Sequence, residues 1–125
     1  MQDEEKLPQL LLIDDESGIC WAISLLLQDQ FVLTLAESVE AALLLLSKPY
    51  ALILLDLRMP GVKGYELLDL IHAKVPETPI VIISATSDRQ TYDEVLEHGA
   101  IGMIEKPFSR QELLTAIQEY CPHLP

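Results

Sequence analysis

Acidic side chains follow two of the most apolar segments of the chain, at the point where each segment ends. Asp14, Asp15 and Glu16 come directly after the run LLLI, and Asp56 closes the run LILLD. Clustered carboxylates repel one another and need a cation, for which a hard divalent ion with oxygen ligands, such as Mg²⁺, is well suited. An Asp side chain is also a nucleophile that can form an aspartyl phosphate. The acids therefore suggest a magnesium site beside a phosphate acceptor.

A hydroxyl and an ammonium group end two further apolar segments. Ser84 closes the run IVIIS, and Lys106–Pro107 follows the run GMIE. Mg²⁺ and a lysine together neutralise the oxygens of a phosphoryl group during its transfer. Each residue alone has an ordinary structural explanation, since acids before a helix often cap it and most lysines are solvated charges. A common location of all of them would indicate a functional site.

The elements that must position these residues alternate along the chain. Short apolar runs predict strands, and the segments between them carry apolar residues at helical spacing. Three runs are continuous rather than alternating, which is typical of parallel strands covered by helices on both faces. Five such strand–helix units predict an α/β fold with a parallel sheet and right-handed crossovers. The predicted strands are Leu10–Ile13, Phe31–Ala36, Ala51–Asp56, Ile80–Ser84 and Gly102–Glu105.

A parallel sheet of this kind brings the polar residues together. Ligands of an open parallel sheet bind outside the carboxyl ends of the strands, which lie at one edge. The acids, the Ser84 hydroxyl and the Lys106 ammonium come from the ends of four different strands. We therefore expect them to converge on a single site.

Capping signals mark several helix ends. Ser38 precedes the second predicted helix, and both Ser87–Gln90 and Ser109–Glu112 fit the capping-box pattern. Gly99 stands where the fourth helix, predicted over Ser87–His98, should stop. These signals support the boundaries of the helices between the strands.

Composition limits the class of protein. The chain has 125 residues, 50% of them hydrophobic, which predicts one globular domain. Its net charge of −12 speaks against binding of DNA, RNA or an anionic membrane by this domain. The apolar runs are far shorter than the roughly 18 residues of a membrane span. Cys20 and Cys121 form no CxxC pair, which favours a reduced, cytoplasmic protein.

The motifs around these residues resemble those of the receiver domains of two-component response regulators, a family that includes the chemotaxis response regulator. They are LLLIDDE, LILLDLRMPG, VIISA and GAIGMIEKPF, in the order and at the spacing of that family. The resemblance implies a (βα)₅ flavodoxin-like fold with sheet order 2-1-3-4-5. It also implies a flexible N-terminus over residues 1–9, a receiver domain over residues 10–121, and a tail or the start of a linker over residues 122–125.

The resemblance implies a role for each site residue. Asp56 is expected to accept a phosphoryl group from the phosphohistidine of a histidine kinase or phosphotransfer protein. The side chains of Asp15 and Asp56 and the backbone carbonyl of Arg58 are expected to bind Mg²⁺, with Asp14 acting mainly through a bound water. Lys106 is expected to contact a phosphoryl oxygen, which completes the set of groups around the transferred phosphate.

The resemblance also implies how the signal is switched and how long it lasts. Ser84 is expected to move toward the phosphorylated Asp56 and to change the face formed by the fourth helix, fifth strand and fifth helix. That face would control an output domain or a partner, a second copy of the chain being one candidate. Arg58 and Thr86 are expected to border the path of the hydrolytic water and to tune the lifetime. Lys106–Pro107 is a candidate for a cis peptide bond.

Two positions depart from the family pattern. Met103 stands three residues before Lys106, where family members often have a Tyr or Phe whose burial changes with phosphorylation. Met fills gaps in several rotamers, so Met103 can still follow Ser84. Ile101 is either an isolated apolar surface residue or, together with Met103, part of an apolar signalling patch.

Three other functions are the alternatives. The first is a phosphorylation-independent pseudo-receiver used only for binding, although all the acids, the hydroxyl and the lysine are present. The second is an aspartyl-phosphate phosphatase of the haloacid dehalogenase type, which usually has an Asp where this chain has Arg58. The third is a nucleotide-binding flavodoxin-like protein, but neither GxGxxG nor GxxxxGK[ST] is present. We therefore expect no enzyme, only a chain that catalyses its own phosphorylation and dephosphorylation.

Overall fold

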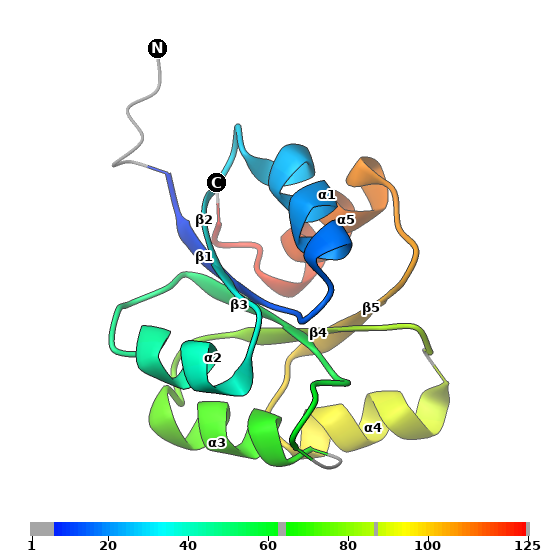
Figure 1. Cartoon of the computed structure of the whole chain (residues 1–125). Helices are drawn as coiled ribbons and strands as arrows, with labels where there is room; N and C mark the ends of the chain where they lie inside the picture. The colour runs from blue at the N-terminus through cyan, green and yellow to red at the C-terminus, as the bar shows by residue number, and fades with distance from the viewer. Residues whose placement is uncertain (1–6, 63–64, 87, 125) are drawn as a thin grey trace.

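Five strands and five helices alternate along residues 7–62, 65–86 and 88–124, the part of the chain that the structure, a computed structural model, describes (Figure 1). The strands are β1 (Gln9–Ile13), β2 (Val32–Ala36), β3 (Leu52–Asp56), β4 (Ile80–Ser84) and β5 (Gly102–Glu105). The helices are α1 (Ser17–Leu27), α2 (Val39–Leu45), α3 (Glu66–Lys74), α4 (Arg89–Glu97) and α5 (Arg110–Tyr120).

All five strands are parallel and form one sheet in the order β2-β1-β3-β4-β5. The register keeps the strand ends level, since Ile13 pairs with Leu55 and Ser84 pairs with Glu105. The carboxyl ends of β1, β3, β4 and β5 therefore meet at one edge. The predicted α/β fold and strand order are confirmed.

Helices cover both faces of the sheet. Figure 1 shows α1 and α5 on one face and α2, α3 and α4 on the other. Because side chains alternate along a strand, Leu10 and Leu12 join the core beneath α1 and α5, while Leu11 and Ile13 join the core on the opposite face. Every residue of β3 and β4 is buried. Burial on both faces explains why the apolar runs of the sequence are continuous.

Three of the predicted helix ends are confirmed. The Ser38 hydroxyl accepts a hydrogen bond from the N–H of Ala41 at the start of α2. Ser109 and Glu112 form the predicted capping box of α5. Gly99 follows α4 with a φ of +109°, a left-handed conformation that favours glycine.

The start of α4 differs from the prediction. Asp88 is the N-cap of this helix, and its carboxylate accepts a hydrogen bond from the N–H of Thr91. Its extended backbone lets the carboxylate reach the first turn, which makes Asp88 an effective cap. Ser87, which the predicted capping box contains, lies outside the described residues.

The predicted domain boundaries stay predictions, because residues 1–6 and 125 also lie outside the described part of the chain. β1 starts at Gln9, which pairs with Val32. Among the described helices, none combines the length and the apolar character that crossing a membrane requires.

Tyr120 of α5 packs directly on β5 at Gly102. Its hydroxyl donates a hydrogen bond to the carbonyl oxygen of Met103 at 3.1 Å. A Cβ atom added to Gly102 would clash with the Tyr120 ring. The ring therefore fills the space that a side chain at residue 102 would need.

Replacing Gly102 with alanine should lower the free energy of unfolding by about 1–3 kcal/mol, because the Tyr120 ring must shift to admit the methyl group. Urea unfolding measures the change. Gly18→Ala is the matched control: no atom lies within 4 Å of the added Cβ, and the α1 helix should gain about 0.5–1 kcal/mol. Equal stabilities of the two variants would contradict the packing of Tyr120 on β5.

Candidate functional site

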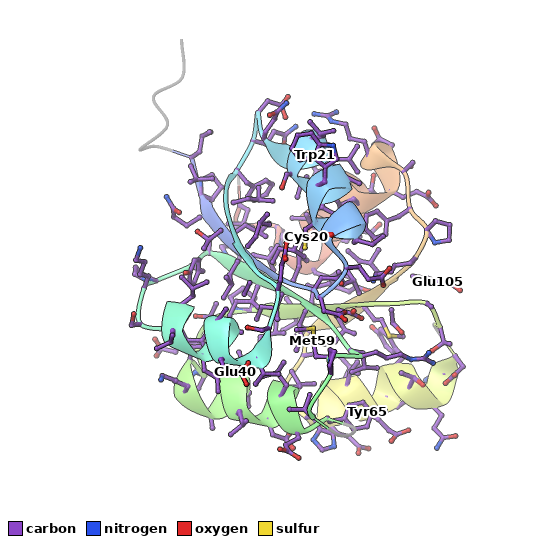
Figure 2. All side chains as sticks on the ribbon, viewed as in Figure 1. Cys20, Trp21, Glu40, Met59, Tyr65 and Glu105 are labelled. Atoms are coloured by element: carbon purple, nitrogen blue, oxygen red, sulfur yellow. The ribbon has the colours of Figure 1, made fainter. Side chains whose placement is uncertain are left out.

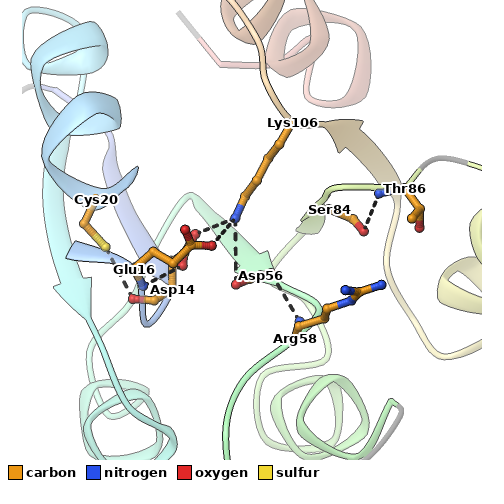
Figure 3. Close-up of polar contacts among 8 residues, drawn as sticks. All are labelled: Asp14, Glu16, Cys20, Asp56, Arg58, Ser84, Thr86 and Lys106. Carbon is orange, nitrogen blue, oxygen red and sulfur yellow. Dashed lines mark hydrogen bonds and ion pairs between the residues drawn. The ribbon is translucent and has the colours of Figure 1, made fainter. Parts of the chain in front are cut away.

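The site lies at the carboxyl edge of the sheet, where the ends of four strands meet (Figure 3). Asp14 follows β1, Asp56 ends β3, Ser84 ends β4, and Lys106 follows β5. Asp14, Asp56 and Ser84 are the buried polar residues of the described chain. The structure therefore brings together the polar residues that the sequence places at the strand ends.

Asp14 has the most enclosed carboxylate of the site, with none of its surface exposed. The N–H of Glu16 donates to its Oδ1 at 2.9 Å, and the ammonium of Lys106 donates to its Oδ2 at 3.0 Å. The Cys20 thiol donates to its backbone carbonyl at 3.3 Å. Burial raises the pKa of Cys20 to about 11, so this thiol stays protonated and serves as a donor. Each polar group of Asp14 is thereby oriented by the protein.

Asp56 is almost as deeply buried as Asp14, with 6% of its surface exposed. The N–H of Arg58 donates to its Oδ1 at 3.2 Å, and Oδ2 lies 3.8 Å from Lys106 Nζ. Burial raises the pKa of Asp56 from 3.8 to about 6, and the nearby Asp14 carboxylate acts in the same direction. The Arg58 N–H and the Lys106 charge oppose this rise without cancelling it. The charged form of Asp56 is therefore held in an unfavourable environment.

The three aspartates form a suitable site for a divalent cation. One carboxylate oxygen from each of Asp14, Asp15 and Asp56 lies within 4.8 Å of the others, in the part of the chain that the structure describes. Asp15 is exposed while the other two are buried, so the cluster opens to solvent on one side. Hard oxygen donors with a surplus of negative charge are what Mg²⁺ prefers.

Lys106 lies among three carboxylates, two from the segment between β1 and α1 and one from the end of β3. Its Nζ is 3.0 Å from Asp14 Oδ2, 3.6 Å from Glu16 Oε1 and 3.8 Å from Asp56 Oδ2. Burial alone would lower the pKa of Lys106, but the hydrogen bond to Asp14 and the charges of the three acids outweigh it and raise the pKa. The Lys106–Pro107 peptide bond is cis. The raised pKa keeps Lys106 positively charged within the acidic cluster.

Ser84 and Thr86 lie beside the acids, at the end of β4. The N–H of Thr86 donates to the Ser84 hydroxyl at 3.2 Å, and the N–H of Lys106 donates to the Ser84 carbonyl at 2.7 Å. A cavity of about 520 Å³ opens here, and its walls include Asp15, Arg58, Ser84 and Thr86. Arg58 and Thr86, which are expected to tune the lifetime, therefore border the same space as the Ser84 hydroxyl.

Met103 and Ile101 take different environments. Met103 is only 8% exposed and packs in the core beneath α4, while Ile101 is 37% exposed. Of the two alternatives for Ile101, this structure does not show the patch shared with Met103, because Met103 is buried. Met103 lies within β5, where the alternation of side chains turns it toward the core, and Ile101 precedes the strand.

Two residues of this region were not assigned a role from the sequence. Glu16 contacts Lys106, and Tyr120 holds the backbone of Met103. The first contact joins segments from opposite ends of the chain, and the second joins the consecutive elements β5 and α5. Glu16 belongs to the acidic run after β1, which was the only signal for it in the sequence.

A model of the response regulator receiver domain matches residues 10–118 of the chain. The chain belongs to this family. Response regulator ArlR of Staphylococcus epidermidis is 39% identical over 113 residues, which are 87% of this chain and 50% of ArlR. This receiver domain therefore spans about half the length of the curated relatives it matches.

Solved structures share the fold of this receiver domain. A response regulator receiver domain protein from Clostridium thermocellum has a TM-score of 0.82 and 26% identity, over 94% of this chain and 96% of that chain. The BeF3-activated receiver domain of DrrB, a Thermotoga maritima protein, has a TM-score of 0.81 and 24% identity, over 93% of this chain and 98% of that chain. Both likenesses support the assignment of the flavodoxin-like fold.

Replacing Asp56 with asparagine should raise the free energy of unfolding by about 1–3 kcal/mol at pH 7.5 in the presence of a chelator. An acid whose pKa is higher in the folded protein than in the unfolded one destabilises the fold above that pKa. The advantage of the variant should therefore shrink as the pH falls from 6 to 4. Urea unfolding across this range measures it.

Glu40→Gln is the control, because it removes a charge from the exposed surface of α2 (Figure 2). Its stability should stay within about 0.5 kcal/mol of the wild type at every pH. An Asp56→Asn variant less stable than the wild type at pH 7.5 would show that the carboxylates do not crowd one another.

Proposed function

We propose that this receiver domain is the phosphoacceptor switch of a two-component system, with Asp56 as the acceptor. The observation that carries the proposal is the convergence on Asp56 of a lysine, a hydroxyl and two further aspartates at the carboxyl edge of the sheet. The donor would be the phosphohistidine of a histidine kinase or a phosphotransfer protein. The family to which the chain belongs supports this choice of donor.

In the transfer, a carboxylate oxygen of Asp56 attacks phosphorus and a new P–O bond forms. The P–N bond of the phosphohistidine breaks, and its electron pair stays on the imidazole, which leaves as a neutral group once protonated. Lys106 is close enough to neutralise charge on the phosphoryl oxygens. Ser84 supplies a hydroxyl that can donate to the phosphorylated form.

Asp14, Asp15 and Asp56 would hold Mg²⁺, together with the backbone carbonyl of Arg58. The ion supplies positive charge that offsets the crowded carboxylates and the incoming phosphoryl group. The fit rests on the three oxygens within 4.8 Å of one another. Asp14 is held by two hydrogen bonds and is the least free of the three to move.

The chain would act on itself alone and not turn over external substrates. An aspartyl-phosphate phosphatase usually needs a second acid two residues past the nucleophile, and Arg58 stands there. A pseudo-receiver, the other alternative, would not require a lysine held among three carboxylates. The self-phosphorylating switch therefore accounts for more of the site than either alternative does.

An apolar groove of about 500 Å³ adjoins the site and suits the approach of the donor. Ile19, Ala22 and Leu26 of α1 form one wall, and Pro107 and Phe108 form the other. Lys106 lines the same groove, which places its mouth next to the acceptor. A helix of a phosphotransfer protein that packed its apolar side chains here would bring its phosphohistidine to Asp56.

The output surface would be the face of α4, β5 and α5. Ser84 begins the segment that leads to α4. Its movement toward the phosphorylated Asp56 would therefore displace this segment and α4 first. Met103 lies in the core beneath α4, where it can fill the space that Ser84 leaves. This face would then bind an output domain, a partner or a second copy of the chain.

Incubation with acetyl phosphate and Mg²⁺ should add one phosphoryl group to the wild type, and intact mass spectrometry measures it. Asp56→Asn should gain none, because it lacks the nucleophile. Asp15→Ala and excess chelator should both abolish labelling, because the metal site is lost. Equal labelling of Asp56→Asn, or labelling that survives the chelator, would contradict the proposed function.

Substituting serine for Ile19 or Leu26 should slow transfer from a phosphohistidine protein by about tenfold, since each change removes apolar surface from the groove. The rate with acetyl phosphate should stay within about twofold, because this small donor does not need the groove. Leu44→Ser is the control, since Leu44 is 78% exposed on α2. An equal loss with both donors would show damage to the site and not to docking.

Met103→Ala should leave labelling of Asp56 intact and weaken the response of α4. In the wild type, amide NMR shifts on phosphorylation should cluster in residues 84–106, and in the variant those of α4 should shrink by half or more. The physical reason is the space that alanine leaves unfilled behind Ser84. Shifts confined to the acidic loops, or largest in α2, would assign the output to another face.

A further inference from the structure

Glu16 lies at the start of α1, next to the carboxylate cluster. It is the N-cap residue of α1, but its side chain makes no capping hydrogen bond. Its carboxylate instead lies 3.6 Å from the ammonium of Lys106 (Figure 3). The side chain is 62% exposed, so it reaches Lys106 from the solvent side of the site.

The ammonium of Lys106 is shared unequally among three carboxylates. A lysine has three N–H donors, and the three oxygens that surround it lie at 3.0 Å from Asp14, 3.6 Å from Glu16 and 3.8 Å from Asp56. The acceptor residue Asp56 is the most distant of the three. Lys106 therefore lies closest to Asp14, and closer to Glu16 than to Asp56.

The two acids that hold Lys106 differ in how easily they can release it. Asp14 is fully buried, and a buried carboxylate without a partner is costly. Glu16 can turn into water, where its charge is solvated at little cost. Glu16 is thus the partner that Lys106 can exchange for another anion.

We propose that Glu16 is a positioning residue, which holds Lys106 back from Asp56 and competes with the phosphoryl group for its ammonium. The inference rests on the proposed function and adds a residue to it. When Asp56 carries a phosphoryl group, Lys106 exchanges its contact with Glu16 for one with a phosphoryl oxygen, and no covalent bond changes in this exchange. Glu16 thereby favours the unphosphorylated arrangement of the site.

Beryllofluoride, named in the structure of the DrrB receiver domain, serves as the probe that stands in for the phosphoryl group. With saturating Mg²⁺, Glu16→Gln should bind it about two- to fivefold more tightly than the wild type, the range expected for one exposed ion pair. The amide NMR signals of Ser84 and Thr86 report the binding. Glu40→Gln, which removes a charge far from Lys106, should bind as the wild type does.

Glu16→Asp separates the contact from the charge. This variant keeps the negative charge but is shorter by one methylene, so it withdraws from Lys106. Its affinity for beryllofluoride should move in the same direction as that of Glu16→Gln. In the absence of any ligand, the side-chain NMR signals of Lys106 should shift in both Glu16 variants and stay unchanged in Glu40→Gln.

Two results would overturn the inference. One is an affinity of Glu16→Gln for beryllofluoride that equals or falls below that of the wild type. The other is a Glu16→Asp variant that behaves as the wild type in both measurements, because charge alone would then act. Failure of the wild type to bind beryllofluoride with Mg²⁺ would instead count against the proposed function, and the Lys106 signals would still decide whether Glu16 positions the ammonium.

Discussion

The contact between Lys106 and the buried carboxylate of Asp14 is the interaction on which the site depends. It joins residues 92 positions apart, one after the first strand and one after the last, at 3.0 Å. Asp14 has no exposed surface, so without this ammonium its negative charge would be buried without a positive partner, which is costly. The parallel sheet makes the contact possible, because the carboxyl ends of β1 and β5 lie at the same edge, and the long Lys106 side chain reaches across the ends of the strands between them.

The site is costly for the fold, and the sheet around it offsets that cost. Burial raises the pKa of Asp56 to about 6, which means that the charged carboxylate opposes folding at neutral pH. The strands β3 and β4, which lie beneath it, are buried along their whole length. The stability that these apolar strands contribute allows the Asp56 carboxylate to remain in an unfavourable environment, a compromise that is common at functional sites.

The two faces of the sheet offer different surfaces to partners. The groove beside α1 and Phe108 opens next to Lys106, on the face that α1 and α5 cover. Met103 lies on the opposite face, in the core beneath α4. Ser84 lies at the end of β4, so in the proposed function a change at Asp56 would be received from one face and passed to the other. Tyr120 links the faces further, since it reaches from α5 to the carbonyl of Met103.

The sequence by itself determined the strands, their order along the chain and the polar residues at their ends. Continuous apolar runs that alternate with amphipathic segments are typical of buried parallel strands, and parallel strands place their carboxyl ends together. Local capping at Ser38 and Ser109 was equally readable, because a cap involves residues three positions apart. Only the tertiary structure decided that Lys106 lies closer to Asp14 than to Asp56, that Glu16 reaches it, and that Met103 is buried while Ile101 is not. Those outcomes depend on distances between side chains from remote segments, which are set by the packing of helices on the sheet and by no local pattern.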